Sequence, residues 1–243
     1  MTDSLNFAGK TVLVIGGSSG IGNATAQAFR AAGAEVHVWG TRASPKDYAG
    51  DSNLEGLHYA QMDVGDIAAI EAYAPPFKKL DVLVQSQGMV LYKRQEFAMA
   101  GFSKVLNVNL TSLMAAAMKF HDMLAAAKGS MIIVSSTAAF QATKGNPGYN
   151  ASKAGAAGLA RTLAVTWAGD GIRVNGIAPG FVSTKMTTIT TENPARRAAA
   201  EDRIPLGRIG EPHEIAGVAL FLASPLASYI IGQTIIADGG LVL

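Results

Sequence analysis

The chain alternates short runs of β-branched and other apolar residues with longer, alanine-rich stretches of helical periodicity. The apolar runs cover residues 11–15, 35–39, 57–60, 81–85, 130–135, 172–177 and 234–237. The helical stretches cover about 20–32, 66–73, 102–126, 149–168 and 212–222. Buried strands separated by helices predict a parallel sheet with helices on both faces. We therefore expect an α/β fold with a doubly wound sheet of seven parallel strands, formed by residues 1–243 as a single domain.

Composition supports this fold and excludes several classes of function. Apolar residues make up 49 % of the 243 residues and charged residues 16 %, so the chain can bury a large core. The net charge is +2 with both signs mixed along the chain, which gives no electrostatic reason to expect a nucleic acid partner. No apolar run approaches the roughly 20 residues that span a bilayer, so we expect no membrane partner.

The sequence contains no cysteine. This excludes disulfides, zinc–thiolate sites and a cysteine nucleophile, and a reducing compartment is the natural setting. Residues 1–10 lack the charged flank and apolar core of a signal peptide, so we expect a cytoplasmic protein. The four histidines have no metal-ligand spacing, and we interpret them as structural or surface residues, with no metal site: His37, His58, His121 and His213.

A glycine-rich turn follows the first predicted strand and opens the first predicted helix. It reads Gly16-Gly17-Ser18-Ser19-Gly20-Ile21-Gly22. Gly16 permits a tight turn, Gly20 lets the backbone approach a diphosphate, and Gly22 lets the helix pack on the strand. The free N–H groups and positive dipole end of the helix then face the phosphates. A strand, this turn and a helix in succession predict a dinucleotide-binding, Rossmann-type domain.

A tyrosine and a lysine lie four residues apart on the predicted helix 149–168, so Tyr149 and Lys153 share one helix face. A phenol has an ordinary pKa of about 10, and a nearby ammonium lowers that pKa by favouring the phenolate. Ser136 follows the predicted strand 130–135 and lies at the carboxyl edge of the sheet, where ligands bind in such folds. We expect these three residues to be catalytic, with Tyr149 as general acid and base.

These motifs resemble those of the short-chain dehydrogenase/reductase family, including its 3-oxoacyl reductase-like branch, across nearly the whole chain. Asp63-Val64 is similar to the family's adenine-contacting pair and Asn107-Val108-Asn109 to its central-helix asparagine motif. Pro179-Gly180-Phe181-Val182-Ser183-Thr184 is similar to its nicotinamide-binding turn, and Asp238-Gly239-Gly240 to its C-terminal signature. The resemblance implies a nicotinamide-dependent oxidoreductase that transfers a hydride between the cofactor and a ketone or secondary alcohol.

The resemblance also implies roles for single residues. Tyr149 protonates the carbonyl oxygen as the hydride arrives, and Ser136 donates a hydrogen bond to the same oxygen. Lys153 holds the nicotinamide ribose and tunes Tyr149. Asn109 is the fourth residue expected to be catalytic, and it keeps a water near Lys153. Val182 and Thr184 are expected to contact the carboxamide of the cofactor. The full set of residues expected to contact the cofactor is Gly16, Ser18, Ser19, Gly20, Ile21, Gly22, Gly40, Thr41, Arg42, Asp63, Val64, Gln85, Ser86, Gly88, Tyr149, Lys153, Pro179, Gly180, Val182 and Thr184.

Two places depart from the family pattern. Ile15 stands where a Thr usually precedes the first glycine, which removes a side-chain hydrogen bond and keeps the turn. After the predicted strand 81–85 the family usually has Asn-Asn-Ala-Gly, and this chain has Gln85-Ser86-Gln87-Gly88. Gly88 still allows the backbone to approach the cofactor, whereas the longer amides change the contacts to adenosine and ribose.

The end of the second predicted strand predicts which nicotinamide is used, because it faces the adenosine ribose. An Asp there would repel a 2′-phosphate, but this chain has Gly40, Thr41 and Arg42, with no carboxylate before Asp47. Arg42 can pair with a phosphate, and Ser18 and Thr41 can donate to it. We expect NADP(H), and NAD(H) is the alternative cofactor if Arg42 points into solvent.

Residues 183–208 form a polar, Thr-rich segment that interrupts the alternation. Asn193 as N-cap and Pro194 at the first helical position predict a short helix over 195–203. A long excursion beside the ligand edge of a sheet is often a substrate lid, and an ordinary surface loop is the alternative. Apolar side chains that could line a substrate pocket, or equally belong to the core, are Met89, Phe140, Phe181, Met186 and Ile189.

Other functions share these motifs. A reductase of 3-oxoacyl thioesters on an acyl-carrier protein would need a basic rim at the pocket. The residues that could supply this rim are Lys93, Arg94, Arg196, Arg197 and Arg203. A solvated helix face explains the same residues equally well. Epimerases of nucleotide sugars use the same Tyr and Lys but usually carry a further substrate domain. A non-catalytic dinucleotide sensor normally loses the Tyr or the Lys, and both are present here.

Small residues recur on several faces of the predicted helices 102–126 and 149–168. Examples are Ala115-Ala116-Ala117 and Ala154-Gly155-Ala156-Ala157-Gly158. A helix that is apolar all round is expected to be covered, and small side chains let helices of two subunits approach closely. Because the equivalent helices of the family build a dimer that pairs into a tetramer, we expect a homotetramer.

Overall fold

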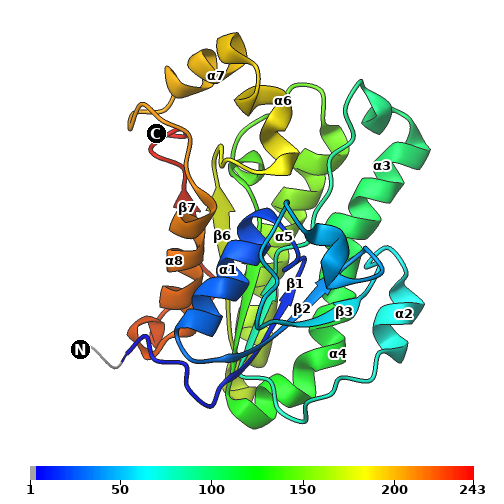
Figure 1. Ribbon diagram of the computed structural model, residues 1–243, viewed down its shortest axis with the longest axis vertical. Helices are drawn as coiled ribbons and strands as arrows, with labels where there is room; N and C mark the ends of the chain where they lie inside the picture. The colour runs from blue at the N-terminus through cyan, green and yellow to red at the C-terminus, as the bar shows by residue number, and fades with distance from the viewer. Residues whose placement is uncertain (1–3) are drawn as a thin grey trace.

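The apolar runs assemble into one sheet of seven parallel strands in the computed structural model, which describes residues 4–243 (Figure 1). The strand order is β3-β2-β1-β4-β5-β6-β7. The strands are β1 (Thr11–Ile15), β2 (Glu35–Gly40), β3 (His58–Gln61), β4 (Val82–Gln85), β5 (Ser130–Val134), β6 (Arg173–Pro179) and β7 (Thr234–Ala237). The chain winds outward from β1 in one direction and from β4 in the other, which confirms the predicted doubly wound fold. The crevice between β1 and β4 is the place where such sheets bind ligands.

Two layers of helices cover the sheet. The helices are α1 (Gly20–Ala31), α2 (Ile67–Ala72), α3 (Met99–Leu106), α4 (Ser112–Ala127), α5 (Pro147–Trp167), α6 (Thr188–Thr191), α7 (Pro194–Glu201) and α8 (Pro212–Ala223). In β1, Val12 and Val14 pack with the layer of α1 and α8, whereas Leu13 and Ile15 pack with the layer of α2, α4 and α5 (Figure 1). Burial of both faces explains why the strands read as continuous apolar runs.

The predicted helix 102–126 is interrupted. The chain forms α3, a single π turn at Asn107–Thr111, and then α4. A π turn adds one residue to a helical turn and shifts the direction of its side chains, and such turns frequently occur at functional sites. Here the turn carries Asn109, whose side chain is fully buried.

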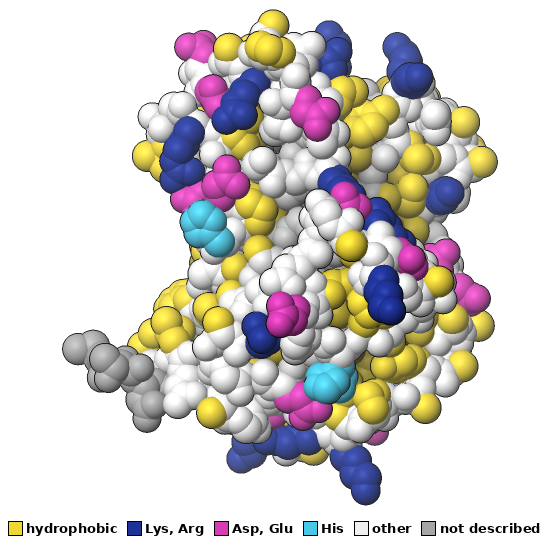
Figure 2. Space-filling model, viewed as in Figure 1, with side chains coloured by type: hydrophobic (Ala, Val, Ile, Leu, Met, Phe, Trp, Pro, Cys, Tyr) yellow, Lys and Arg dark blue, Asp and Glu magenta, His cyan; other side chains and the backbone are white. Residues whose placement is uncertain are grey.

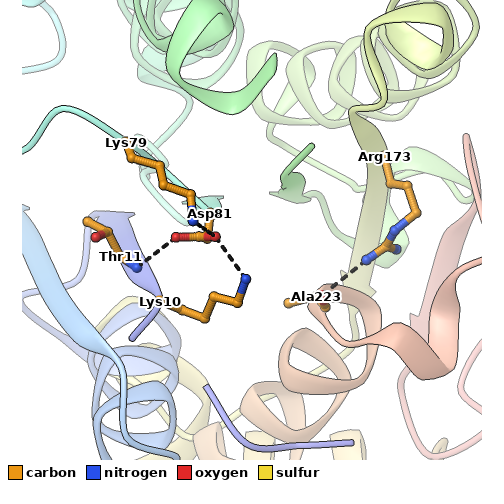
Figure 3. Close-up of polar contacts among 6 residues, drawn as sticks. All are labelled: Lys10, Thr11, Lys79, Asp81, Arg173 and Ala223. Carbon is orange, nitrogen blue, oxygen red and sulfur yellow. Dashed lines mark hydrogen bonds and ion pairs between the residues drawn. The ribbon is translucent and has the colours of Figure 1, made fainter. Parts of the chain in front are cut away.

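Polar contacts tie the elements together at the amino edge of the sheet (Figure 3). The buried carboxylate of Asp81 accepts a hydrogen bond from the Thr11 N–H at 3.1 Å and pairs with Lys10 at 3.0 Å and Lys79 at 2.9 Å. Arg173 donates to carbonyl groups at the C-terminal end of α8, including Ala223 O at 3.0 Å. Cations are favourable at that end of a helix. These contacts anchor β1, β4 and β6 at the edge opposite the predicted site.

The segment 183–208 lies beyond the carboxyl edge of the sheet and contains α6 and α7, at the top of Figure 1. Asn193 caps α7 by accepting a hydrogen bond from Arg196 N at 3.0 Å, and Pro194 is the first residue of the helix, as predicted. The helix ends at Glu201, two residues before the predicted end. Its two ends meet, because Val182 and Gly210 form a parallel bridge. The segment is therefore a closed excursion from a fixed base.

The surface carries Lys and Arg side chains interspersed with Asp and Glu on the face seen in Figure 2. This distribution agrees with the mixed signs along the sequence. Within residues 4–243, no helix is both long enough and apolar enough to span a membrane.

Candidate active site

A cleft of about 440 Å³ runs along the carboxyl edge of the sheet, from the glycine turn to the ends of β2, β4, β5 and β6. All the residues expected to contact the cofactor line this cleft, with the exception of Arg42 and Gln85. Three of the four residues expected to be catalytic, Ser136, Tyr149 and Lys153, line it as well. Residues that are far apart in the sequence therefore meet in one cleft, because parallel strands present all their carboxyl ends at one edge.

The glycine turn packs so closely against its neighbours that two of its residues have no room for a side chain. Gly16 has a φ of +74°, and a Cβ there would lie 2.8 Å from the Gln87 N atom. A Cβ at Gly22 would lie 2.2 Å from the Gly16 carbonyl oxygen, so only glycine lets α1 pack this closely. Ser19, the N-cap of α1, makes no side-chain capping hydrogen bond. The first N–H groups of α1 therefore remain available to an anion, and this cradle fits the diphosphate of a dinucleotide.

Tyr149 and Lys153 lie on the first two turns of α5, and Ser136 follows β5. The Lys153 ammonium nitrogen is 5.7 Å from the centroid of the Tyr149 ring and donates to Val134 O at 2.9 Å. The Ser136 hydroxyl oxygen accepts a hydrogen bond from Ala138 N at 3.1 Å, which leaves its own proton free to donate. A phenol, a hydroxyl donor and an ammonium thus face one space.

Burial dominates the protonation of this group of residues. It raises the pKa of Tyr149, and a hydrogen bond from Ser136 opposes the rise. Burial also lowers the pKa of Lys153 to about 8. The pKa of Tyr149 therefore lies above its ordinary value of about 10 rather than below it, because desolvation of the phenol is the largest effect on that pKa. Tyr149 is a neutral phenol at pH 7, the form that a proton donor requires.

Asn109 does not line the cleft, and it connects the loop after β4 with α5. Its Oδ1 accepts from Met89 N at 2.8 Å, and its Nδ2 donates to Met89 O at 2.9 Å and to the Ser152 hydroxyl at 3.1 Å. Ser152 in turn donates to the Tyr149 carbonyl oxygen at 2.7 Å. A Cβ at Gly88 would lie 3.5 Å from Lys153 Nζ and 3.7 Å from Asn109 Oδ1, so the two side chains reach the same spot beneath the loop.

Arg42 points away from the cleft, unlike the neighbouring Thr41. Its guanidinium lies 4.5 Å from the centroid of the Tyr48 ring and pairs with Asp51 at 2.9 Å. Asp51 also pairs with Lys185, a residue of the cleft. The free phosphate-binding guanidinium expected from the sequence is thus already paired, because the loop after β2 folds back and brings the Asp51 carboxylate to it.

Gly40 has a steric reason to lack a side chain. A Cβ there would lie 2.6 Å from both the Ser18 hydroxyl and the Tyr48 hydroxyl. A side chain at position 40 would require both hydroxyl groups to move, which favours glycine at this strand end.

Gln85 is fully buried and does not contact the cleft, which corrects the sequence-based expectation. Its Nε2 donates to Leu113 O at 3.1 Å, so the side chain points between the sheet and α4. Gln87, which was not expected to contact the cofactor, lines the cleft instead. Its Nε2 donates to Gln85 Oε1 at 3.2 Å, and its Oε1 is buried without a hydrogen-bond partner in the described chain. The alternation of side chains along an extended backbone places both amides on one side, but sequence alone did not tell which of them reaches the cleft.

A second cavity of about 340 Å³ adjoins the cleft and shares Ser136 and Tyr149 with it. Phe181, Met186 and Ile189 line it, as expected of a substrate pocket. Two other candidates do not: Met89 lines the cofactor cleft, and Phe140 lines neither cavity and is exposed.

The second cavity is also lined by charged residues, and all of them are positive. Lys144 and Arg203 are part of the lining, which contains no Asp or Glu. Of the other basic residues considered from the sequence, Arg196 donates to Ile189 O at 3.3 Å and Arg197 pairs with Glu201 at 2.9 Å. The lining of the second cavity therefore combines apolar side chains with two positive charges and no negative charge.

Two histidines that look scattered in the sequence are neighbours on β2 and β3. His37 pairs with His58 in register, and their rings stack at 4.7 Å with an interplanar angle of 23°. His37 also hydrogen-bonds Glu35 at 3.0 Å. One ligand atom each from Glu35, His37 and His58 lies within 4.8 Å of the other two, a grouping that the spacing of the histidines in the sequence does not reveal.

The fold, the glycine turn and the group of Ser136, Tyr149 and Lys153 define a doubly wound dinucleotide-binding protein with a phenol, a hydroxyl and an ammonium beside its cleft. A family model described as enoyl-(acyl carrier protein) reductase matches residues 15–242. The chain is 36 % identical over 250 residues to 3-oxoacyl-(acyl-carrier-protein) reductase of Chlamydia pneumoniae, covering 98 % of each chain. It is 34 % identical to 2-dehydro-3-deoxy-D-gluconate 5-dehydrogenase of Bacillus subtilis, covering 98 % of this chain and 96 % of the relative.

Among solved structures, the chain is similar to an Agrobacterium tumefaciens protein described as a 2-deoxy-D-gluconate 3-dehydrogenase with bound NADP. The TM-score is 0.88, the identity is 33 %, and 99 % of each chain is covered. The chain belongs to the short-chain dehydrogenase/reductase family and is an NAD(P)-dependent oxidoreductase that acts on CH–OH or keto groups.

The buried ammonium of Lys153 generates a prediction about stability. Because burial lowers the pKa of Lys153 from 10.5 to about 8, its charged form opposes folding fully below pH 8, and this penalty disappears as the pH rises to 10.5. We expect Lys153→Met to raise the free energy of unfolding at pH 7 by about 3 kcal/mol, at about 1.4 kcal/mol per pKa unit. The gain should shrink towards pH 10. Urea denaturation at several pH values measures it.

Lys78→Met is the matched control, because Lys78 is exposed and its removal should change stability little at any pH. A Lys153→Met protein that is less stable than wild type at pH 7 would show that the hydrogen bond to Val134 O outweighs the desolvation of the ammonium.

Proposed function

We propose that this protein transfers a hydride between NADP(H) and a ketone or secondary alcohol, with Tyr149 as general acid and base. The observation that carries the proposal is that Ser136 and Tyr149 line both the cofactor cleft and the second cavity. A carbonyl held in the second cavity therefore meets a hydroxyl donor and a phenol at the boundary with the cleft. This is the geometry that hydride transfer from a dinucleotide requires.

When bound, the reduced nicotinamide supplies a hydride to the carbonyl carbon. Ser136 donates a hydrogen bond to the carbonyl oxygen, since its own oxygen already accepts from Ala138 N. Tyr149 transfers its phenolic proton to that oxygen as negative charge develops there. The cationic Lys153 stabilises the phenolate that remains and holds the nicotinamide ribose. Asn109 keeps a water near Lys153 through which Tyr149 regains a proton from bulk solvent. Oxidation of the alcohol runs the same steps in reverse.

The cleft offers groups for each part of NADP(H). The N-terminal end of α1 binds the diphosphate, Asp63 and Val64 bind the adenine, and Val182 and Thr184 bind the carboxamide. Ser18 and Thr41 donate hydrogen bonds to the 2′-phosphate. Arg42 releases the Asp51 carboxylate and pairs with the 2′-phosphate instead. The bound NADP of the Agrobacterium relative and the lack of a carboxylate at positions 40–42 support NADP(H) over NAD(H).

The substrate that the second cavity favours is a small carbonyl compound with a carboxylate. Lys144 and Arg203 are cations in a lining without acidic residues, and the described residues form no ion pair with either of them. The sugar-acid dehydrogenases among the relatives are named for substrates of this kind.

A 3-oxoacyl thioester carried by an acyl-carrier protein is the second candidate substrate. The name of the Chlamydia relative and the exposed Lys93 and Arg94, next to the lining residue Tyr92, favour it. A non-catalytic dinucleotide sensor is disfavoured, because Tyr149 and Lys153 both face the cleft.

We assign residues 183–208 the role of a substrate lid on the single domain. Val182 and Gly210 join its two ends, and the hydrogen bond from the Tyr92 hydroxyl to Met186 O at 2.6 Å links it to the opposite wall of the second cavity. Closure of such a segment excludes water from hydride transfer. The cysteine-free composition supports a cytoplasmic enzyme.

With NADPH and a panel of small oxo acids, their esters and 3-oxoacyl thioesters, we expect reduction of the acids to be the most efficient.

The first functional prediction concerns Tyr149. Tyr149→Phe should lower kcat by about 10² or more, because the general acid is lost, and leave cofactor binding nearly unchanged. The absorbance of NADPH measures turnover. Near-wild-type turnover of Tyr149→Phe would overturn the assignment.

The second concerns the cofactor. The ratio of kcat/KM should favour NADPH over NADH, and Arg42→Ala should reduce this preference by about 1–3 kcal/mol, the range of a charge-assisted hydrogen bond. Lys46→Ala is the matched control, since Lys46 is an exposed cation of the same loop. An equal or better efficiency with NADH contradicts the proposed cofactor.

The third concerns assembly. Met114 and Met118 on α4 and Val165 on α5 are exposed apolar side chains on one helical layer. Ile236 on the edge strand β7 and Tyr229 before that strand are exposed as well. Two such surfaces suit the two interfaces of a symmetric tetramer. Light scattering at micromolar concentration should give a homotetramer, and a monomer mass refutes this.

A further inference from the structure

We propose that Glu96 is a positioning residue for Tyr149. Its buried carboxylate fixes the first turn of α5 against the wall of the second cavity and adds a negative charge near the phenol. The inference rests on the proposed role of Tyr149 as general acid and base. Glu96 lies in a short turn (Gln95–Phe97) before α3, 53 residues before Tyr149 in the sequence, and carries no motif that would identify it.

Glu96 is buried without a cation. It is 1 % exposed, and no Lys, Arg or His in residues 4–243 pairs with it. A buried carboxylate in this position is costly unless hydrogen bonds satisfy it. Three donors do so: Leu91 N at 2.9 Å and Asn146 Nδ2 at 3.4 Å to Oε1, and Tyr149 N at 2.8 Å to Oε2. Because both oxygens accept from N–H groups, an amide cannot replace the carboxylate without turning one acceptor into a donor.

The contact to Tyr149 N caps α5. The N-cap residue, Asn146, makes no capping hydrogen bond to its own helix, and Pro147 at the first position has no N–H. Glu96 therefore supplies from another segment the acceptor that an N-cap side chain usually provides. Its negative charge lies at the positive end of a 21-residue helix, where the helix dipole stabilises it. A Cβ at Gly148 would lie 3.3 Å from Glu96 Oε2, so the carboxylate and the helix are closely packed.

The same carboxylate fixes the substrate wall. Val90 and Tyr92 line the second cavity, and Leu91 between them donates its N–H to Glu96. Asn146 reinforces the connection, because its Nδ2 also donates to Leu91 O at 3.0 Å. Glu96 thus sets the distance between the wall that holds the substrate and the turn of α5 that holds Tyr149. A small displacement between reacting groups is enough to lower turnover strongly.

Glu96 also acts on the protonation of Tyr149. The groups that face the phenol are Ser136, which lowers its pKa through a hydrogen bond, Tyr92 and Glu96, which raise the pKa through their charges, and the ammonium of Lys153 at 5.7 Å from the ring. Removing the charge of Glu96 should therefore lower the pKa of Tyr149. Reduction needs the cationic Lys153, whose pKa is about 8, as well as the neutral phenol, so the alkaline limb of the reductase pH profile falls in two steps. The step at higher pH, which belongs to Tyr149, should move to lower pH.

Two variants separate position from charge. Glu96→Gln keeps the size and removes the charge, and it should lower kcat by about tenfold or more and move the higher step of the alkaline limb of kcat to lower pH. Glu96→Asp keeps the charge but is one methylene shorter, so it should lower kcat and leave that step in place. The dissociation constant of NADPH should stay within about twofold of wild type in both variants, because Glu96 is not part of the cofactor cleft. Glu71→Gln, an exposed residue on α2, is the control for loss of one negative charge.

Turnover is expressed per NADPH-binding site, so that loss of folded protein does not count as loss of catalysis. A purely structural role for Glu96 would lower the melting temperature and leave kcat per site and the pH profile unchanged in both variants, and this result overturns the inference. Tyr149→Phe is measured alongside. If Tyr149→Phe keeps its turnover, the proposed function of Tyr149 fails. If Tyr149→Phe is inactive and both Glu96 variants behave as wild type, only the positioning role fails.

Discussion

The parallel arrangement of all seven strands is the constraint on which the rest of the molecule depends. It sends every strand end of one kind to the same edge, so the two edges can take different tasks. At the amino edge, Asp81 and Arg173 bind neighbouring elements together and complete their own hydrogen bonds within the protein. At the carboxyl edge the strands end in glycine, serine and turns, and the N–H groups of α1 are left free for a ligand.

Helix α5 carries the unfavourable electrostatics that the proposed chemistry needs. Lys153 is buried with one hydrogen bond to Val134 O, and desolvation lowers its pKa. Glu96 is buried at the start of the same helix and is satisfied by N–H donors rather than by a cation. The charge of Lys153 is costly for folding, whereas hydrogen bonds satisfy that of Glu96, and both residues lie next to Tyr149, the residue proposed to transfer a proton. Residues held in this way against the preference of the fold mark functional sites more clearly than packing does.

The loops that surround the cleft explain why two expected contacts are absent. The loop after β2 folds back on itself, so that Asp51 pairs with Arg42. The Arg42 guanidinium then stacks on the Tyr48 ring instead of entering the cleft. After β4, Gln85 points into the core and Gln87 takes the position facing the cleft. Both outcomes depend on where a side chain leaves the end of a strand, and a displacement of one or two residues changes which side chain is presented.

The sequence by itself determined the doubly wound sheet, the cradle of the glycine turn and the common site of Ser136, Tyr149 and Lys153. These follow from local rules: apolar periodicity, glycine where a backbone must approach closely, and i, i+4 spacing on a helix. Only the tertiary structure decided the burial that raises the pKa of Tyr149, the pairing of Arg42 with Asp51, the stacking of His37 on His58 and the contact of Glu96 with Tyr149 N. Burial and contacts between distant segments depend on how elements pack, and no local pattern in the chain encodes the distance between residues 96 and 149.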